Sequence, residues 1–193
     1  MYRLEQAVRA LFAFAQPVDE ALAARYLPPP LLGLFHRMTR DEQLHSLNVL
    51  RDVLAQGDTP PALAAAALLH DVGKCRYPMR VWQRSLPVAV QQIAPDLARR
   101  LAQGDPARSF TRPFVVGRLH PAWGAELIAA ALDSPHPSGH VEVILPEREG
   151  FRARADTDAL LWLVVHHQDD AANWRDHPLF PLLERLQRAD DAN

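Results

Sequence analysis

The chain has 193 residues and a mass of 21.6 kDa, with 48% hydrophobic and 23% charged side chains, values typical of a single globular domain. Its one cysteine excludes an internal disulfide framework and predicts a reducing compartment, which we expect to be the cytoplasm. A net charge of −2 provides no basic field for duplex nucleic acid. The apolar runs are too short to cross a bilayer, and Glu5 and Arg9 interrupt the N-terminal one, so we expect neither a membrane span nor a secretory signal.

Helical periodicity dominates the first seventy residues. Apolar residues at three- and four-residue steps predict a helix over 2–15, and a second short helix over 19–27 ends at three consecutive prolines. The letters TRDE open a third helix over 39–56 with the pattern of a capping box, and Gly57 is its expected stop. An alanine-rich helix over 59–69 is apolar nearly all round, so we expect it to be central and buried.

The rest of the chain continues this all-helical pattern. Further helices are predicted at 79–85, 88–103, 122–132, 157–168 and 178–190, with loops at 104–113 and 134–140. The one strand-like piece predicts a small β-hairpin near 141–154. The expected fold is an all-α bundle, with residues 1–38 as a helical extension packed on a core domain formed by residues 39–193.

The most distinctive motif is the pair His70-Asp71, which ends the buried helix and is followed at once by Gly73 and Lys74. Burying an ionised aspartate costs several kcal/mol unless a cation or hydrogen bonds compensate for the lost hydration. A bound metal ion supplies that compensation. Taken alone, the pair has a second explanation, in which Asp71 caps the following turn and His70 is half exposed at the helix end.

Further histidines and a late aspartate make a metal site the better joint explanation. The candidate ligands lie on or beside separate predicted helices, and they are His45, His70, Asp71, His120, His166, His167 and Asp190. Adjacent residues of a helix diverge by about 100°, so one helix is expected to present His166 and His167 to two different ions. The other histidines lie in loop-like or surface-like contexts and are expected to be structural: His36, His136, His140 and His177.

These motifs resemble the HD superfamily of metal-dependent phosphohydrolases. The strings that carry the resemblance are HSLNVL at 45–50, AAALLHDVGK at 65–74, HPAWGAEL at 120–127 and VVHHQD at 164–169. The added His120 and the His166-His167 pair look like the binuclear branch, which includes the HD-GYP cyclic-dinucleotide phosphodiesterases. The following segment, QDDAANWRDHP, lacks the glycine-tyrosine-proline signature, which argues against cyclic di-GMP as the substrate.

The resemblance implies an HD-domain helical bundle and a division of the ligands between two divalent transition-metal ions. One ion would be held by His45, His70, Asp71 and Asp190, and the other by His120, His166 and His167, with Asp71 as the bridge. Imidazole and carboxylate ligands suit Fe or Mn, with Zn, Co or Ni as alternatives. Asp71 and Lys74, the chain's one lysine, would be the catalytic residues, with Lys74 contacting substrate phosphate.

Several neighbouring residues have two explanations. Asp41 lies one turn before His45, at a position where some relatives place an acidic residue that holds a third ion. Its other explanation is a favourable interaction with the helix dipole. Asp191 competes with Asp190 as a ligand. The remaining candidates either contribute to an anion pocket or a base-stacking surface or are ordinary surface and packing residues: Arg76, Arg80, Arg118 and Trp123. Cys75 lies off the ligand set.

The expected function is hydrolysis of a nucleotide, a cyclic (di)nucleotide or another small phosphate ester by a metal-activated water. The expected partner is this small phosphorylated substrate, and the chain is expected to be a monomer or a homodimer. Two other classes remain open. One is an HD-fold di-iron oxygenase, and the other is a catalytically silent regulatory module that binds a nucleotide.

Overall fold

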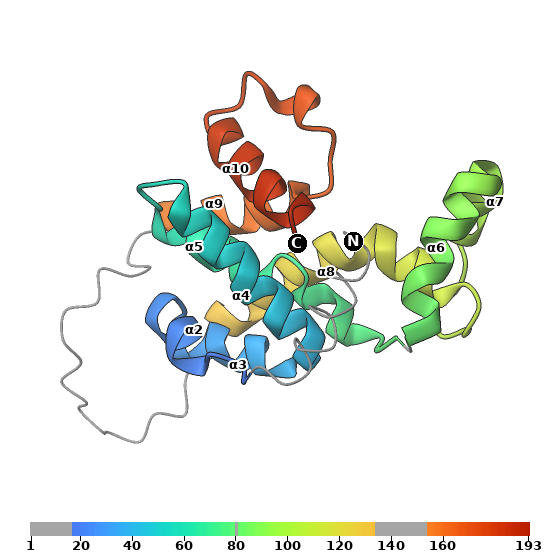
Figure 1. Ribbon diagram of the computed structural model, residues 1–193, viewed down its shortest axis with the longest axis horizontal. Helices are drawn as coiled ribbons and strands as arrows, with labels where there is room; N and C mark the ends of the chain where they lie inside the picture. Colours follow the sequence, from blue (N-terminus) through green and yellow to red (C-terminus); the bar gives the residue numbers. More distant parts are fainter. Residues whose placement is uncertain (1–16, 80, 134–153) are drawn as a thin grey trace, which may run out of the picture.

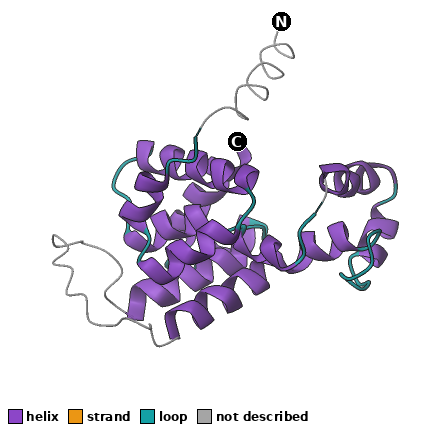
Figure 2. Cartoon of the chain, turned by 90° about the horizontal axis from the view of Figure 1, so that it is seen from below, coloured by secondary structure: helices purple, strands orange, loops and turns teal. Residues whose placement is uncertain are grey.

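The computed structural model describes residues 17–79, 81–133 and 154–193. Within these residues every regular element is a helix, which confirms the predicted all-α fold (Figures 1 and 2). The predicted helix over 2–15 and the predicted hairpin up to residue 153 lie outside the described residues.

The regular structure in the described part of the chain consists of α-helices and two short 3₁₀ helices. In chain order they are α2 (Glu20–Tyr26), α3 (Pro29–Arg37), α4 (Arg40–Ala55), α5 (Pro61–Leu69), the 3₁₀ helix η1 (Val72–Arg76), α6 (Val81–Ile93), α7 (Pro95–Leu101), α8 (Arg112–Asp133), α9 (Arg154–His166), the 3₁₀ helix η2 (Ala171–Trp174) and α10 (Phe180–Asp191).

Helix α5 forms the centre of the bundle. Every side chain from Ala62 to Leu69 is buried, as its apolar sequence predicts. Its alanines allow close approach, and the helix packs against α4, α9, α10, α2 and α3. Side chains of α2 and α3, including Leu31 and Phe35, belong to this same core. The bundle therefore fixes the C-terminal end of α5, where His70 and Asp71 lie.

The predicted ends of α4 are confirmed in detail. Thr39 and Glu42 form the reciprocal capping box, in which the backbone N–H of Thr39 donates to the Glu42 carboxylate at 2.9 Å. After the helix, Gly57 adopts φ +116°, a conformation that side-chain-bearing residues rarely reach. Local sequence therefore sets both ends of the helix that carries His45.

Other helix boundaries differ from the predicted ones. The three prolines end α2, but α3 starts within them, because proline suits the first turn of a helix. Helix α8 begins at Arg112 and continues through Pro121, so the prediction that His120 lies at a helix start is wrong. The break between α6 and α7 falls at Ala94, whose φ −145° and ψ 70° reflect the proline that follows it.

Helices α6 and α7 form an arm that projects from the bundle and packs against α8 (Figures 1 and 2). Exposed large apolar side chains lie on this arm and on the loop after it, and they are Trp82, Ile93, Leu97 and Phe110. No described helix combines the length and the hydropathy that a membrane crossing requires.

Candidate metal centre

The candidate centre is built around Asp71, where α5 ends. His70 is the C-cap of α5, and its Nδ1 lies 3.1 Å from the carbonyl oxygen of Ala67, one of the carbonyls that a helix end leaves without a partner. This contact assigns the proton to Nδ1 and turns Nε2 toward the centre. His70 is fully buried and Asp71 is 5% exposed, so this carboxylate is held away from bulk water.

Asp71 belongs to two clusters of potential ligands. We call Asp71, His120 and His167 the inner group, and His45, His70, Asp71 and Asp190 the outer group. Each residue of the inner group has one potential ligand atom within 4.8 Å of those of the other two. The same is true of His45, His70 and Asp71 in the outer group. The two groups therefore share one carboxylate, the arrangement expected of a bridged pair of ions.

All three residues of the inner group are buried. Asp71 Oδ1 lies 3.2 Å from His120 Nε2 and 3.9 Å from His167 Nε2, and these two ring nitrogens lie 3.2 Å from each other. The Nδ1 atom of His167 faces the Val164 carbonyl oxygen at 2.8 Å, so both rings present Nε2 to the same point. Two such nitrogens and a carboxylate oxygen form a typical donor set for a divalent transition metal.

Pro121 explains how His120 is oriented inside α8. A proline within a helix has no N–H for the carbonyl four residues earlier, here that of Gly117. His120 Nδ1 lies 3.1 Å from this carbonyl oxygen and 2.9 Å from that of Val116. Pro121 therefore leaves the Gly117 carbonyl oxygen free to accept from His120 Nδ1. Together with the Val116 carbonyl oxygen, it fixes the imidazole tautomer.

The outer group is more open to solvent and draws on three helices. His45 Nε2 lies 2.8 Å from Asp190 Oδ1, and His70 Nε2 lies 3.4 Å from the same oxygen and 3.7 Å from Asp71 Oδ2. The side chains of His45 and Asp190 are 27% and 29% exposed. α10 therefore completes the group from the far end of the chain.

Gly73 sets the spacing between η1 and α8. A Cβ atom at this residue would overlap the carbonyl oxygen of His120 and lie 2.7 Å from the backbone nitrogen of Gly124. Only a glycine lets the two backbones approach this closely. The glycine that follows the His-Asp pair therefore brings Asp71 and His120 together.

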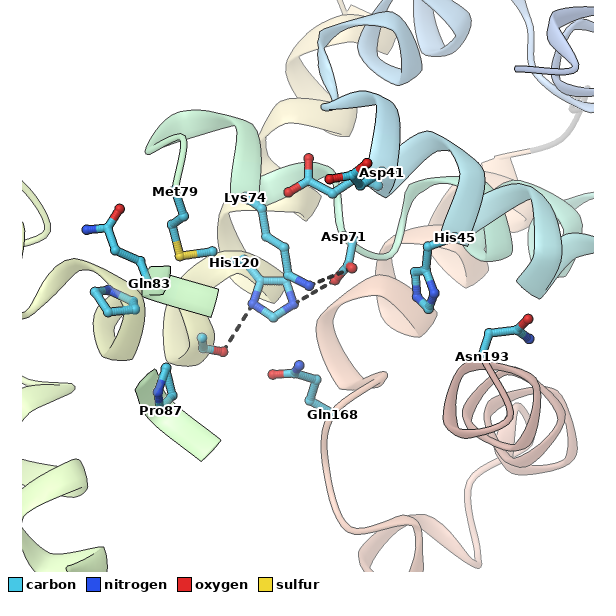
Figure 3. A pocket seen from close by; sticks show the side chains of 13 residues that line it. Asp41, His45, Asp71, Lys74, Met79, Gln83, Pro87, His120, Gln168 and Asn193 are labelled. Carbon is cyan, nitrogen blue, oxygen red and sulfur yellow. Dashed lines mark hydrogen bonds and ion pairs between the residues drawn. The ribbon is translucent and has the colours of Figure 1, made fainter. Parts of the chain in front are cut away.

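A pocket of about 790 Å³ opens onto both groups. Lys74 lies on its wall, and its Nζ donates to Asp71 Oδ2 at 2.6 Å. Figure 3 shows Lys74, Asp71 and His120 at the middle of the pocket, with His45 to one side and Met79, Gln83 and Pro87 to the other. A ligand in this pocket would meet the lysine ammonium beside the shared carboxylate.

Charge pairing shifts the pKa values of these groups. Burial opposes the charged form of Asp71, but His70, His120 and Lys74 outweigh it and hold the Asp71 pKa well below its usual range. Burial likewise opposes ionisation of Asp190, yet His45 and His70 lower its pKa. Both carboxylates are therefore ionised at neutral pH and ready to bind a cation.

The pKa values of two buried histidines are shifted in opposite directions. Burial lowers the pKa of His167 to about 3, with His70 and His120 adding to the effect, so this ring is neutral and has a free lone pair. Burial alone would also lower the pKa of His70, but the carboxylates of Asp71 and Asp190 raise it above 6.5. A positive charge is thus favoured at His70, between the two acids.

The residues fit metal ions. The Nε2 atom of His70 is buried and makes no well-aligned hydrogen bond, although Asp190 Oδ1 lies 3.4 Å away, and such an atom costs about 1–3 kcal/mol unless another group compensates. In the inner group, both Nδ1 atoms face backbone carbonyl oxygens, so the two neutral rings present Nε2 lone pairs to each other and neither Nε2 is a donor. A cation in each group would satisfy these atoms together. The cluster therefore supports the predicted metal-binding character, and the donor set contains no thiolate.

The structure does not bring His166 into either group. Its Nδ1 lies 2.7 Å from Asp169 Oδ2, and its ring packs against Trp162 and Trp174 with centroid distances of 4.8 and 4.2 Å. The physical reason is the divergence of adjacent helical residues by about 100°. Because His167 faces Asp71, His166 faces away, and six of the seven predicted ligands lie together.

The neighbouring candidates are placed as follows. Asp190, rather than the exposed Asp191, contacts the histidines, and Asp41 lies on the pocket wall. Arg76 pairs with Glu126 and lies over Trp123, which packs against Tyr77, while Arg118 donates to the Ala102 carbonyl oxygen. Cys75 is half-buried, and burial raises its pKa. Arg80 lies outside the described residues.

Of the four histidines expected to be structural, two lie within the described residues. His36 is exposed in the last turn of α3. His177 stacks on Trp162 with a centroid distance of 4.0 Å and an interplanar angle of 3°. His136 and His140 lie outside the described residues.

Sequence reasoning missed most of the pocket wall. Met79, Gln83, Pro113, Gly117 and Gln168 line the pocket without belonging to a metal-ligand motif. A local signal existed for Gln168, which directly follows the His-His pair. The other four depend on how α6 and α8 pack, so no local signal marks them.

Comparisons with protein-family models, with curated proteins and with solved structures found no match to this chain.

Proposed function

We propose that this chain is a metal-dependent phosphohydrolase of the HD superfamily, which hydrolyses a small phosphate ester at a binuclear site. The observation that carries the proposal is Asp71, one buried carboxylate shared by two groups of imidazoles whose Nε2 atoms converge on it. The inner and outer groups would each hold one divalent ion, with Fe or Mn the metals best suited to these ligands.

Each part of the centre has a role in this proposal. Two bound ions would supply a water of lowered pKa and neutralise charge on the phosphoryl oxygens. Asp71 fixes the spacing between the two groups, and His120 and His167 keep Nε2 free through their Nδ1 contacts with backbone carbonyls. Lys74 holds its ammonium on the pocket wall, where it would bind a phosphate oxygen.

The experiment combines metal analysis with hydrolysis. Protein prepared with Fe or Mn under anaerobic conditions should bind about two ions per chain and hydrolyse a generic aryl phosphodiester. Lys74→Met should keep the metal and weaken substrate use, because it removes the phosphate contact and leaves every ligand in place. Metal-loaded protein that releases no phosphate or alcohol from any ester in a broad panel would refute the proposal.

A second candidate is the HD-fold di-iron oxygenase. With His166 turned away, the two groups contain four histidines and two aspartates, the ligand set that resembles those oxygenases. Oxygen consumption with a polyol or organophosphonate substrate, and no hydrolysis of any ester, would reverse the order of the two candidates.

The silent regulatory module makes a third prediction. It would bind a nucleotide without turnover and would have no need of metal. Near-zero metal after anaerobic preparation would favour it over both enzymes.

A further inference from the structure

Two rows of side chains extend the pocket away from the candidate metal centre. Met79, Gln83 and Pro87 recur at four-residue steps leading into and along α6, and Pro113, Gly117 and His120 recur at steps of four and three along α8. Residues at such spacing share one face of a helix. The α8 row ends at a ligand of the inner group, so the pocket runs continuously from that group to the α6 wall (Figure 3).

The far part of the pocket is mainly apolar. Met79, Pro87 and Pro113 contribute only carbon and thioether sulfur to their side chains, and Gly117 contributes backbone alone. The Gln83 side chain is polar, but it is 1% exposed and its Nε2 donates to the Ser109 carbonyl oxygen at 2.6 Å. This hydrogen bond ties α6 to the segment before α8, which fixes the wall in place.

In the described part of the pocket, the positive charge lies near the candidate metal centre. Among the lining side chains that the structure describes, Lys74 is the single one with a permanent positive charge, whereas Asp41, Glu42 and Asp71 are acidic. Two described arginines of α8 donate to backbone carbonyl oxygens: Arg112 to those of Pro78 and Pro106, and Arg118 to that of Ala102. The charges of the wall therefore suit one phosphate, placed beside Lys74.

We infer that the pocket takes esters with a single phosphate and an uncharged, largely apolar organic group, which lies against Met79, Pro87 and Pro113. The inference rests on the proposed function, because it names the substrate class of that same site. Among the described side chains of the apolar wall, a second phosphate, as in a cyclic dinucleotide or a nucleoside polyphosphate, would lose hydration and meet no positive charge. The charge of the pocket therefore selects substrates that carry one phosphate group.

The test uses three probes on the full chain loaded with Mn²⁺, with binding measured by calorimetry. They are methylphosphonate, phenylphosphonate and 1,4-phenylenediphosphonate, which share one phosphonate and differ in the ring and in a second charge. Phenylphosphonate should bind most tightly, because its ring contacts the wall. The diphosphonate should bind about tenfold more weakly than phenylphosphonate, because its second phosphonate loses hydration against the wall. A tenfold change corresponds to about 1.4 kcal/mol in binding free energy.

Two substitutions assign the effect to the wall. A Cβ atom on Gly117 meets no other atom within 4 Å, so the side chain of Gly117→Leu starts in open space at the pocket wall. It should weaken phenylphosphonate about tenfold and leave methylphosphonate unchanged. Gly33→Leu is the matched control, because Gly33 also lies in a helix with open space around its Cβ and is not among the residues that line the pocket. Met79→Arg should restore binding of the diphosphonate.

The outcomes separate this inference from the proposed function. A diphosphonate that binds as tightly as phenylphosphonate, or a phenyl ring that adds nothing to methylphosphonate, overturns the inference and leaves the hydrolase standing. Failure of all three probes to bind also overturns it. The expected binding order together with no hydrolysis of any ester supports the monophosphate pocket and refutes the hydrolase.

Discussion

The inner and outer groups share Asp71 but are held in different ways. The inner group is buried, and its histidines are fixed by backbone carbonyls of α8 and α9 and by the close approach at Gly73. The outer group depends on Asp190 in the last turn of α10 and is more than a quarter exposed at His45 and Asp190. A site with one rigid and one adaptable half predicts that the two ions differ in how easily they are lost.

Asp71→Ala should have the largest effect, because it removes the carboxylate that both groups share. We expect both ions to be lost and hydrolysis to fall by more than about a hundredfold. Replacing a residue that only hydrogen-bonds to a metal ligand costs up to about a hundredfold, and Asp71 would be a ligand itself. Metal analysis and a phosphodiester assay measure the two effects. Full turnover by this variant would place the active site elsewhere in the chain.

Gly73→Ala tests the rigidity of the inner group. The added methyl would push η1 away from α8, and we expect a loss of about 2 to 3 kcal/mol in the free energy of unfolding. Gly33→Ala, in a helix with free space around its Cβ, is the control and should be neutral or slightly stabilising. Denaturant unfolding of both variants gives the comparison, and equal stabilities would contradict the close packing.

Asp190→Ala should separate the two groups. Its loss leaves His45 and His70 without their shared carboxylate, so the outer ion should dissociate while the inner ion stays. The adjacent Asp191→Ala is the matched control, since Asp191 is exposed. Metal content should fall from about two ions per chain to about one only in the first variant. Equal losses from both variants would refute the assignment of Asp190.

A pH titration measures the cation preference at His70. The pKa of this residue is raised, so its contribution to stability is complete below 6.5, the unfolded value, and is lost as pH rises through the higher folded value. The pKa of His167 is about 3 in the folded chain, so this ring lowers stability below 6.5, where the unfolded ring is protonated, and has no such effect well above 6.5. A bound ion replaces the proton, so the gap in Tm between metal-loaded and metal-free protein should widen from about pH 6 to about pH 9. A constant or shrinking gap would contradict this.

His166→Phe should have the smallest effect on the metal centre. Its ring contacts Trp162 and Trp174 rather than the ligands, and phenylalanine keeps that packing while losing the contact with Asp169. We expect unchanged metal content and a loss of about 1 kcal/mol in the free energy of unfolding. Loss of one ion would instead return His166 to the ligand set predicted from the sequence.

Some of the fold could be read directly from local patterns. The capping box at Thr39 and the glycine stop at Gly57 act within a few residues, so their effects do not depend on the rest of the chain. The apolar circumference of α5 predicts burial for the same reason. By contrast, Pro121 reads locally as a helix start, and the packing of α8 against η1 and α9 overrides that signal.

The candidate site shows the same division. Residue type and spacing were enough to select His45, His70, Asp71, His120, His167 and Asp190, because a buried acid among imidazoles calls for a cation wherever it lies. They also included His166, which the structure turns away from both groups, because His166 and His167 follow the same apolar run and differ only by about 100° of rotation. They could not find the pocket wall of Met79, Pro113 and Gly117.

The amino-acid order alone determined the helices with clear caps, the central position of α5 and the chemistry of most candidate ligands, since these follow from hydrogen bonding and hydropathy over one or two turns. Tertiary packing decided which ring nitrogen meets which carboxylate, which of two adjacent histidines faces Asp71, and which apolar surfaces enclose the pocket. Those outcomes depend on the rotation and separation of helices far apart in the chain, and differences of one residue in register reverse them.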